Sequence, residues 1–224
     1  MADMEAQFTK FFSKLDRDLE DLSLGGDFQD AAGNLMRDAN VLILLAMAIG
    51  QSDEPGKMKP AAALMVRDGK AILAAADSDA AAAAVKAMQS DLNGSSADPV
   101  VWENAVQLSP LMAKVVPSLT TEIKRLSKNE KTLLRAGNVD KVAGDAAALA
   151  VVAAGSRLSV SETSAPGQEA LWKDCCDHFC AASLKVNETA RALENGGAFA
   201  DYSAALKELE GTCTVCHDKF SGAK

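Results

Sequence analysis

Most of the chain consists of residues that favour helices over strands. Ala, Leu, Lys and Glu are abundant, and runs of β-branched residues are few. Apolar residues recur at helical spacing, for instance along 7–22, where they occupy positions 8, 11, 12, 15, 19 and 22. Only 4% of the residues are aromatic, so small side chains must fill the core and the helices can approach closely. These features predict an all-α protein.

The apolar spacing and the breaks rich in Gly and Pro divide the chain into two series of helices. The first series is expected over 7–22, 28–50, 60–76 and 78–92. The polar segment 93–99 is the clearest linker. The second series is expected over 109–135, 139–158, 168–193 and 199–220, and Pro117 is expected to bend its first helix. We therefore predict two tandem four-helix bundles, formed by residues 1–96 and 97–224.

The two halves resemble degenerate copies of each other. Phe28–Gly33 aligns with Val139–Gly144, and Pro-containing loops and third helices follow in step. The alternative is that any two Ala-rich helical bundles align this well. Residues 1–96 contain neither Cys nor His, so a copy there has lost any thiol or imidazole chemistry. Bulky side chains are then expected to fill its core, among them Leu42, Leu45, Met47, Ile49, Met65 and Met88.

Composition and charge exclude several classes of function. The chain has 23 Lys and Arg against 31 Asp and Glu, and this net charge of −8 disfavours nucleic-acid binding. The longest uninterrupted apolar run, around Val41–Gly50, is about half as long as a membrane-spanning helix requires. No nucleophile–base pair or phosphate-binding loop is recognisable. We expect no nucleic-acid partner, no membrane span and no enzymatic activity.

The sequence Cys213-Thr-Val-Cys216-His217, a CxxCH motif, stands near the C-terminal end. This spacing is typical of haem c attachment, in which two thiols add to the porphyrin vinyl groups and the adjacent His ligates the iron. A thioredoxin-like redox pair is one alternative, but it belongs to α/β folds. A zinc site is another, and it would need further ligands from Cys175, Cys176 or Cys180. We predict one haem c per chain.

The C-terminal position of this motif resembles the class II c-type cytochromes, the cytochrome c prime family. Leu171–Asp174 followed by Phe179 resembles the third helix of that family, and Tyr202–Phe220 resembles its haem-bearing last helix. The likeness covers residues 109–224. It implies a one-electron carrier with Cys213, Cys216 and His217 holding the haem. The family often has a basic residue after the aromatic of this motif, whereas Ser221 follows Phe220 here, so the family's proximal chemistry is not implied in full.

The expected helix 168–193 presents one face toward the pocket. At about 100° per residue, an arc of about 100° contains Trp172, Cys175, Cys176, Phe179, Ser183 and Val186. His178 points away and Cys180 lies at the edge. Trp172, Phe179 and Phe220 are candidates to pack on the porphyrin, the alternative being ordinary core residues. We expect the three cysteines to fill the core rather than form a metal site or disulfide, and the Ser183 hydroxyl to bond to its own helix.

The sixth iron ligand is the main open point of the resemblance. In the family, the distal iron face meets the first helix of the bundle, which carries either a ligating Met or an apolar residue. Met112 is the only methionine in 97–224 and is expected to ligate, which suits electron transfer. The alternative is a core methionine, with Leu108, Leu111 or Val115 beside an open iron that binds nitric oxide or carbon monoxide. A third alternative is a helical interaction module in which haem is a structural staple.

Covalent haem attachment takes place outside the cytoplasm. The motif therefore implies a periplasmic or otherwise exported protein, although the first residues lack the basic and apolar layout of a signal peptide. The resemblance further implies a redox partner protein and the ability to pair as a homodimer.

Overall fold

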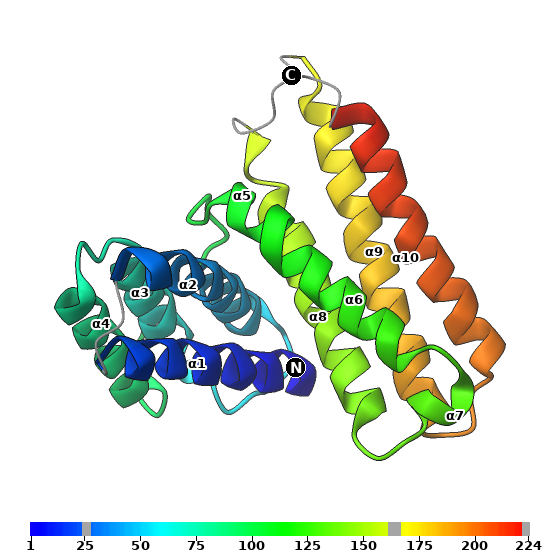
Figure 1. Ribbon diagram of the computed structural model, residues 1–224, viewed down its shortest axis with the longest axis horizontal. Helices are drawn as coiled ribbons and strands as arrows, with labels where there is room; N and C mark the ends of the chain where they lie inside the picture. Colours follow the sequence, from blue (N-terminus) through cyan, green and yellow to red (C-terminus); the bar gives the residue numbers. More distant parts are fainter. Residues whose placement is uncertain (24–27, 161–166, 221–224) are drawn as a thin grey trace. The chain divides into compact units, whose positions relative to one another are not determined.

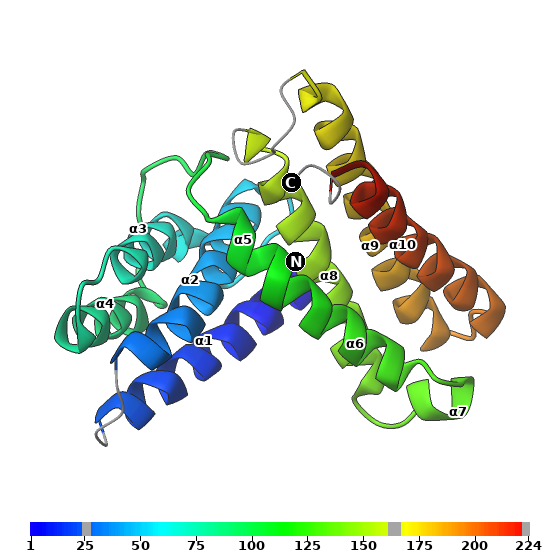
Figure 2. The same cartoon turned by 45° about the horizontal axis from the view of Figure 1, so that its top comes forward.

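The structure, a computed structural model, describes residues 1–23, 28–160 and 167–220, and these residues form helices and loops without a strand. The all-α prediction is therefore confirmed for this part of the chain. Two compact units are formed, Met1–Val115 and Val116–Lys224. The helices of each unit can be followed in Figures 1 and 2. The finer prediction of two bundles repeated in tandem stays a prediction.

The first unit contains four long helices, which pack in sequence, and the first of them also packs against the fourth. All four expected helices are present. They are α1 (Ala2–Ser23), α2 (Phe28–Gln51), α3 (Ala62–Leu73), which follows the short η1 (Lys59–Ala61), and α4 (Ser78–Asp91). The start of α4 is fixed by Asp77, whose carboxylate accepts a hydrogen bond of 2.8 Å from the amide of Ala80.

Large apolar side chains fill the core of the first unit. The six residues expected there are all fully buried: Leu42, Leu45, Met47, Ile49, Met65 and Met88. The expected burial of these side chains is confirmed, while the degenerate-copy interpretation stays a prediction. Among the described helices, α2 is also long and apolar enough over Ala31–Gln51 to cross a membrane, but 67% of that window is buried inside the structure. The expectation that no segment spans a membrane stays a prediction.

A charged cluster lies where α1 meets α2. Arg37 donates two hydrogen bonds of 2.6 Å to the fully buried carboxylate of Asp38, and its guanidinium lies 4.0 Å from Asp18. Burial, followed by the Asp38 carboxylate, raises the pKa of Asp18 above its ordinary value of 3.8, against the opposing effects of Arg37 and Arg17. The ionised form of Asp18 is therefore disfavoured in the folded protein.

We expect Asp18→Asn to raise the midpoint of thermal unfolding at pH 7, by on the order of a few °C. When folding raises the pKa of a carboxyl group, the folded protein loses stability as the pH rises through that pKa. At pH 7 the neutral amide avoids this loss, so the variant is the more stable protein. Below pH 3.8 the wild-type carboxyl is protonated in both states, so the difference should vanish. Asp16→Asn, on an exposed position of α1, is the matched control. A lower midpoint for Asp18→Asn at pH 7 would contradict the role of burial.

The boundary between the units differs from the sequence-based one. It falls between Val115 and Val116, not between 96 and 97, so the segment after the linker belongs to the first unit. The polar groups of that segment find their partners there. The amide of Gln107 donates a 2.7 Å hydrogen bond to the side chain of Asn40, which is fully buried in α2, and Glu103 pairs with Lys70 of α3. The segment 97–115 therefore forms part of the first compact unit, and the predicted domain boundary stays a prediction.

The helix expected over 109–135 is present over most of its length. The chain is helical without interruption through α5 (Leu108–Pro110), the π-helical turn η2 (Leu111–Val115) and α6 (Val116–Leu126), and α7 (Glu130–Leu133) follows after a turn. Pro117 lies in the first turn of α6 and has no amide proton, so it cannot continue a regular hydrogen-bond ladder from the preceding turn. Asn129 begins α7 by accepting a 2.9 Å hydrogen bond from the amide of Thr132.

The second unit is built around α8, whose small residues allow close packing. This helix contacts α6, α7 and α9, and α9 in turn packs against α10. Most of α8 is buried, and Ala, Val and Gly make up most of its length. The remaining boundaries follow the expected ones: α8 is Asn138–Ser156, α9 is Glu169–Leu193 and α10 is Phe199–Phe220.

Candidate functional site

The CxxCH motif lies on the face by which α10 packs against the unit. The fully buried residues of α10 are Tyr202, Ala205 and Leu209, all in its first half. At about 100° per residue, Cys213, Cys216 and His217 fall within an arc of about 100° that continues this face. Cys213 and Cys216 are half-buried and His217 is exposed. The motif therefore presents two thiols and an imidazole together on one side of the helix.

Aromatic side chains from α9 and α10 meet beside the motif. The ring centroids of Trp172 and Phe220 are 5.3 Å apart, with the rings perpendicular. The indole of Trp172 is buried and donates a 2.9 Å hydrogen bond to the carbonyl of Ser156, the last residue of α8. Three helices are thus joined at the end of α10. The structure brings together Trp172 and Phe220 as expected, and Phe179 is buried on α9.

The predicted inward face of α9 is confirmed. Its six members, Trp172, Cys175, Cys176, Phe179, Ser183 and Val186, are all buried. His178 is exposed and Cys180 is half-buried, as the helical projection indicated. The Ser183 hydroxyl donates a 2.8 Å hydrogen bond to the carbonyl of Phe179, which confirms the expected bond to its own helix.

The thiols of α9 and α10 are close neighbours. The Cys216 thiol interacts with Cys175, and Cys176 also interacts with both thiols. Burial, with the neighbouring thiols as the next cause, raises the pKa of Cys216 to about 11, and burial chiefly raises that of Cys176 to about 12. Burial likewise raises the pKa of Cys213. These groups are therefore thiols rather than thiolates at neutral pH.

Two polar contacts join α6 to α10, which sequence reasoning did not identify. Lys124 pairs with Glu210 at 3.1 Å, and the Cys213 thiol lies close enough to interact with both charges. Ser127, just after α6, shares a hydrogen bond with the hydroxyl of the fully buried Tyr202. A buried tyrosine hydroxyl requires a polar partner, but its partner is 75 positions away in the sequence. Both contacts lie before the CxxCH motif along α10.

The residues present match the requirements of a covalently attached haem. The two thiols are spaced by one helical turn, the imidazole follows directly, and none of the three is fully buried. The aromatic pair of Trp172 and Phe220 supplies an apolar wall at the same end of α10. The donor set and its surroundings therefore fit this group.

Two other predicted residues lie outside the described part of the second unit. Met112 is half-buried in η2, which belongs to the first unit. Its assignment as sixth ligand stays a prediction. Ser221 lies outside the described residues. Within those residues, no three Cys, His, Asp or Glu side chains are grouped so as to hold a metal ion, which leaves the zinc alternative without a ligand set.

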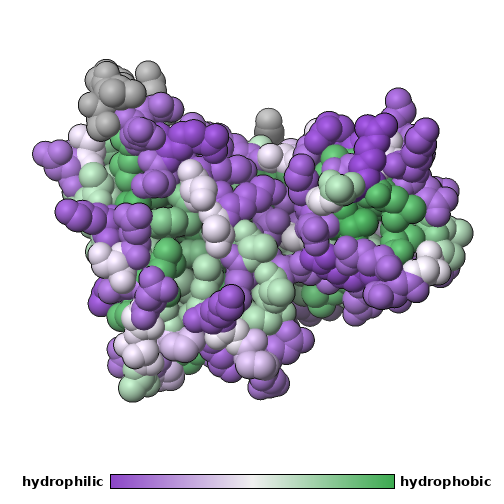
Figure 3. All heavy atoms as spheres, turned by 90° about the horizontal axis from the view of Figure 1, so that it is seen from below, coloured by the Kyte–Doolittle hydropathy of each residue, from purple (hydrophilic) through white to green (hydrophobic). Residues whose placement is uncertain are grey.

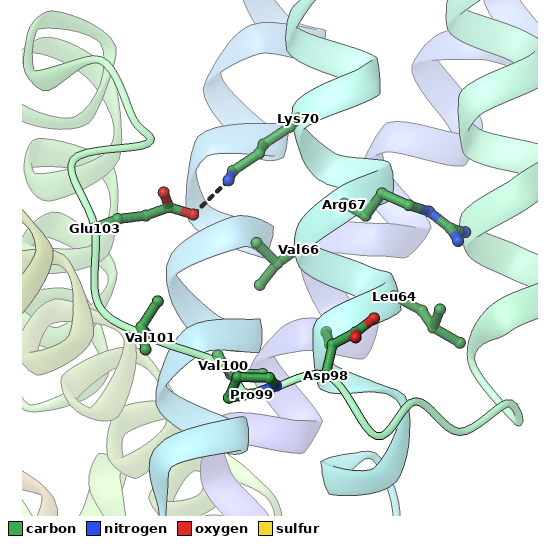
Figure 4. A pocket seen from close by; sticks show the side chains of 10 residues that line it. Leu64, Val66, Arg67, Lys70, Asp98, Pro99, Val100, Val101 and Glu103 are labelled. Atoms are coloured by element: carbon green, nitrogen blue, oxygen red, sulfur yellow. Dashed lines mark hydrogen bonds and ion pairs between the residues drawn. The ribbon is translucent and has the colours of Figure 1, made fainter.

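The first unit has a pocket of about 420 Å³ between α3 and the segment 98–103 (Figure 4). Val66, Val100 and Val101 contribute apolar surface to it. Lys70 points toward Glu103 across the pocket, and the two side chains form an ion pair. Arg67, which also lines the pocket, pairs with Asp68 and Asp91. Because its cations are neutralised by acidic neighbours, the pocket does not present a site for an anionic ligand.

Large apolar side chains are exposed at only a few of the described positions. They are Val101, Leu134, Leu184 and Val215. Figure 3 shows apolar residues among hydrophilic ones on the face seen from below. Single exposed apolar side chains are normal on protein surfaces and do not by themselves indicate an interface between two copies of the chain, so the expected homodimer stays a prediction.

No family model, no curated protein and no solved structure matches the chain.

Proposed function

We propose that the second unit holds one covalently attached haem c and that the protein carries single electrons. The observation that supports this proposal most is the position of the CxxCH motif on α10. Its thiols and imidazole continue the packed face of that helix, beside the aromatic pair of Trp172 and Phe220. The bound haem iron would supply the one-electron redox couple.

Each residue of the site has a distinct part in this function. Cys213 and Cys216 would form the two thioether bonds, which hold the group even where burial is incomplete. His217 would bind the iron through its imidazole and so set one axial ligand. Trp172, Phe179 and Phe220 would exclude water from the porphyrin edge, and a drier environment tunes the redox potential.

One haem per chain is the expected content of the full chain matured in a host that attaches haem c outside its cytoplasm. The measurement is a pyridine haemochrome assay, after extraction with acid acetone to remove haem that is not covalently held. Residues 1–96 contain no Cys or His, so the first unit should add nothing. A value near zero would refute the proposal, and a value near two would refute the haemless assignment of the first half.

A second candidate function, binding of a small gas such as nitric oxide or carbon monoxide, is favoured by one observation. Residues 116–224 contain no methionine, and Met112 belongs to the other unit. If Met112 does not ligate, the iron has one protein ligand and an open position. The visible spectrum separates the candidates. A low-spin spectrum with a weak sulfur-to-iron band in the far red supports the electron carrier, and a high-spin spectrum supports the gas-binding protein.

The cellular location and the partner of the protein follow from the same proposal. Attachment of haem c requires export, so we infer a periplasmic or otherwise exported protein. We also infer that electrons are exchanged with a redox partner protein, and that the chain carries no substrate chemistry of its own.

A further inference from the structure

Two cysteines of α9 have no part in the proposed attachment of haem, yet they lie against the motif. The helices α9 and α10 pack side by side. The ring centroids of Trp172 and Phe220 are 5.3 Å apart. Because the two helices pack antiparallel, the residues one turn further along α9, Cys175 and Cys176, lie at the level of Cys216 on α10. The approach of these thiols to Cys216 is therefore part of the regular packing of α9 on α10.

Cys216 and Cys213 interact with different neighbours. The Cys216 thiol interacts with Cys175 of α9. The charges that interact with Cys213 are instead those of Lys124 on α6 and Glu210 on α10. Cys180 lies about one turn after Cys175 and Cys176 on α9 and is only half-buried. Of the thiols of α9, Cys175 has the largest effect on Cys216, and Cys176 interacts with it as well.

We propose that Cys175 and Cys216 form a disulfide in the haem-free chain, and that this bond blocks haem attachment until it is reduced. The effect on attachment rests on the proposed function, while formation of the disulfide does not. A disulfide at Cys216 removes one of the two thiols required by the CxxCH motif. The disulfide would link α9 to α10, and Cys216 could not form a thioether bond while it is present.

The reaction is a thiol–disulfide exchange with a small disulfide such as oxidised glutathione. One protein thiol first loses its proton to solvent, and the thiolate so formed attacks a glutathione sulfur, which breaks the glutathione disulfide and releases one glutathione thiolate. The second protein thiolate then attacks the mixed disulfide and releases the second glutathione. In total, two protein thiols lose two protons and two electrons, and one glutathione disulfide becomes two thiols. A reducing dithiol reverses the sequence and restores Cys216.

The test uses the full chain produced without haem and treated with oxidised glutathione. Trypsin should release all three α9 cysteines in one peptide, 174–185, and both motif cysteines in another, 208–219. Mass spectrometry without reduction should find these two peptides joined. Cys175→Ser should lower the joined species at least about tenfold, because the interacting thiol is gone. The matched controls Cys176→Ser and Cys213→Ser should retain it.

Each outcome decides the assignment. Loss of the joined species in Cys176→Ser but not in Cys175→Ser would overturn the choice of Cys175. A bond between Cys213 and Cys216 alone, found within peptide 208–219, would overturn the proposal, as would free thiols throughout. The wild-type chain answers the question without any substitution, so a variant that fails to fold does not remove the test.

A second measurement separates this proposal from the proposed function. Haem content per chain is compared after maturation under oxidising conditions. We expect Cys175→Ser to carry more haem than the wild type, and Cys180→Ser to match the wild type. Absence of haem in every chain, together with a joined peptide pair, would refute the proposed function and leave the disulfide standing. Equal haem in all chains, with no joined pair, would refute the disulfide and leave the proposed function standing.

Discussion

Replacing both Cys213 and Cys216 with Ala is expected to reduce covalently attached haem from one per chain to none. Each thiol forms one thioether bond in the proposed site, so the double variant has no bond to hold the group. Either single variant should keep haem through one thioether but lose more of it in acid acetone than the wild type does. The measurement is the haem that remains with the protein after extraction, together with the mass of the intact chain.

The control for this experiment is Cys180→Ala. This residue is a half-buried thiol of the same unit and lies outside the motif. It should retain full haem, which would show that loss of a thiol alone does not impair maturation. Covalent haem in the double variant would show that other cysteines form the bonds, and Cys175 and Cys176 would then be the candidates.

His217→Ala is expected to leave haem attached and to change both its spectrum and its redox potential. The variant keeps both thiols but loses the proposed imidazole ligand of the iron. Axial ligands set haem potentials over a range of about 0.8 V, so we expect a shift larger than about 0.1 V. The measurements are the visible spectrum and a potentiometric titration of the full chain.

The chain offers one further imidazole as a control. His178 is exposed on α9 and is directed away from the inward face of that helix. His178→Ala should therefore leave the spectrum and the potential unchanged. If His217→Ala had no effect while His178→Ala did, the assignment of the iron ligand would be reversed.

The parts of the fold that depend on local periodicity were predictable. The inward face of α9 is an example, since a helix repeats every 3.6 residues and the projection of Trp172, Phe179 and Ser183 needs no tertiary information. The same holds for the buried residues of α2, because its second half is apolar on nearly all sides.

The parts that depend on contacts between distant segments were not predictable. The π-helical turn η2 within the helical stretch 108–126 combines Pro117 with the packing of this turn on α2. The assignment of 97–115 to the first unit depends on partners such as Asn40, which lies far away in the sequence. The interaction of Cys175 with Cys216 follows from how two helices are aligned, and single-helix periodicity does not determine that alignment.

The bond between Gln107 and Asn40 has a practical consequence for dissecting the chain. A cut in the polar segment 93–99 looks attractive, but it would separate α2 from the residues that satisfy its buried amide. The first fragment would expose Asn40 and the surface covered by η2, where Leu111 is fully buried. The second fragment would begin with a segment in which Gln107 and Glu103 have lost their partners in the first unit. Fragments that end and begin near Val115 and Val116 keep these partners together, although that junction falls inside the continuous helical stretch 108–126.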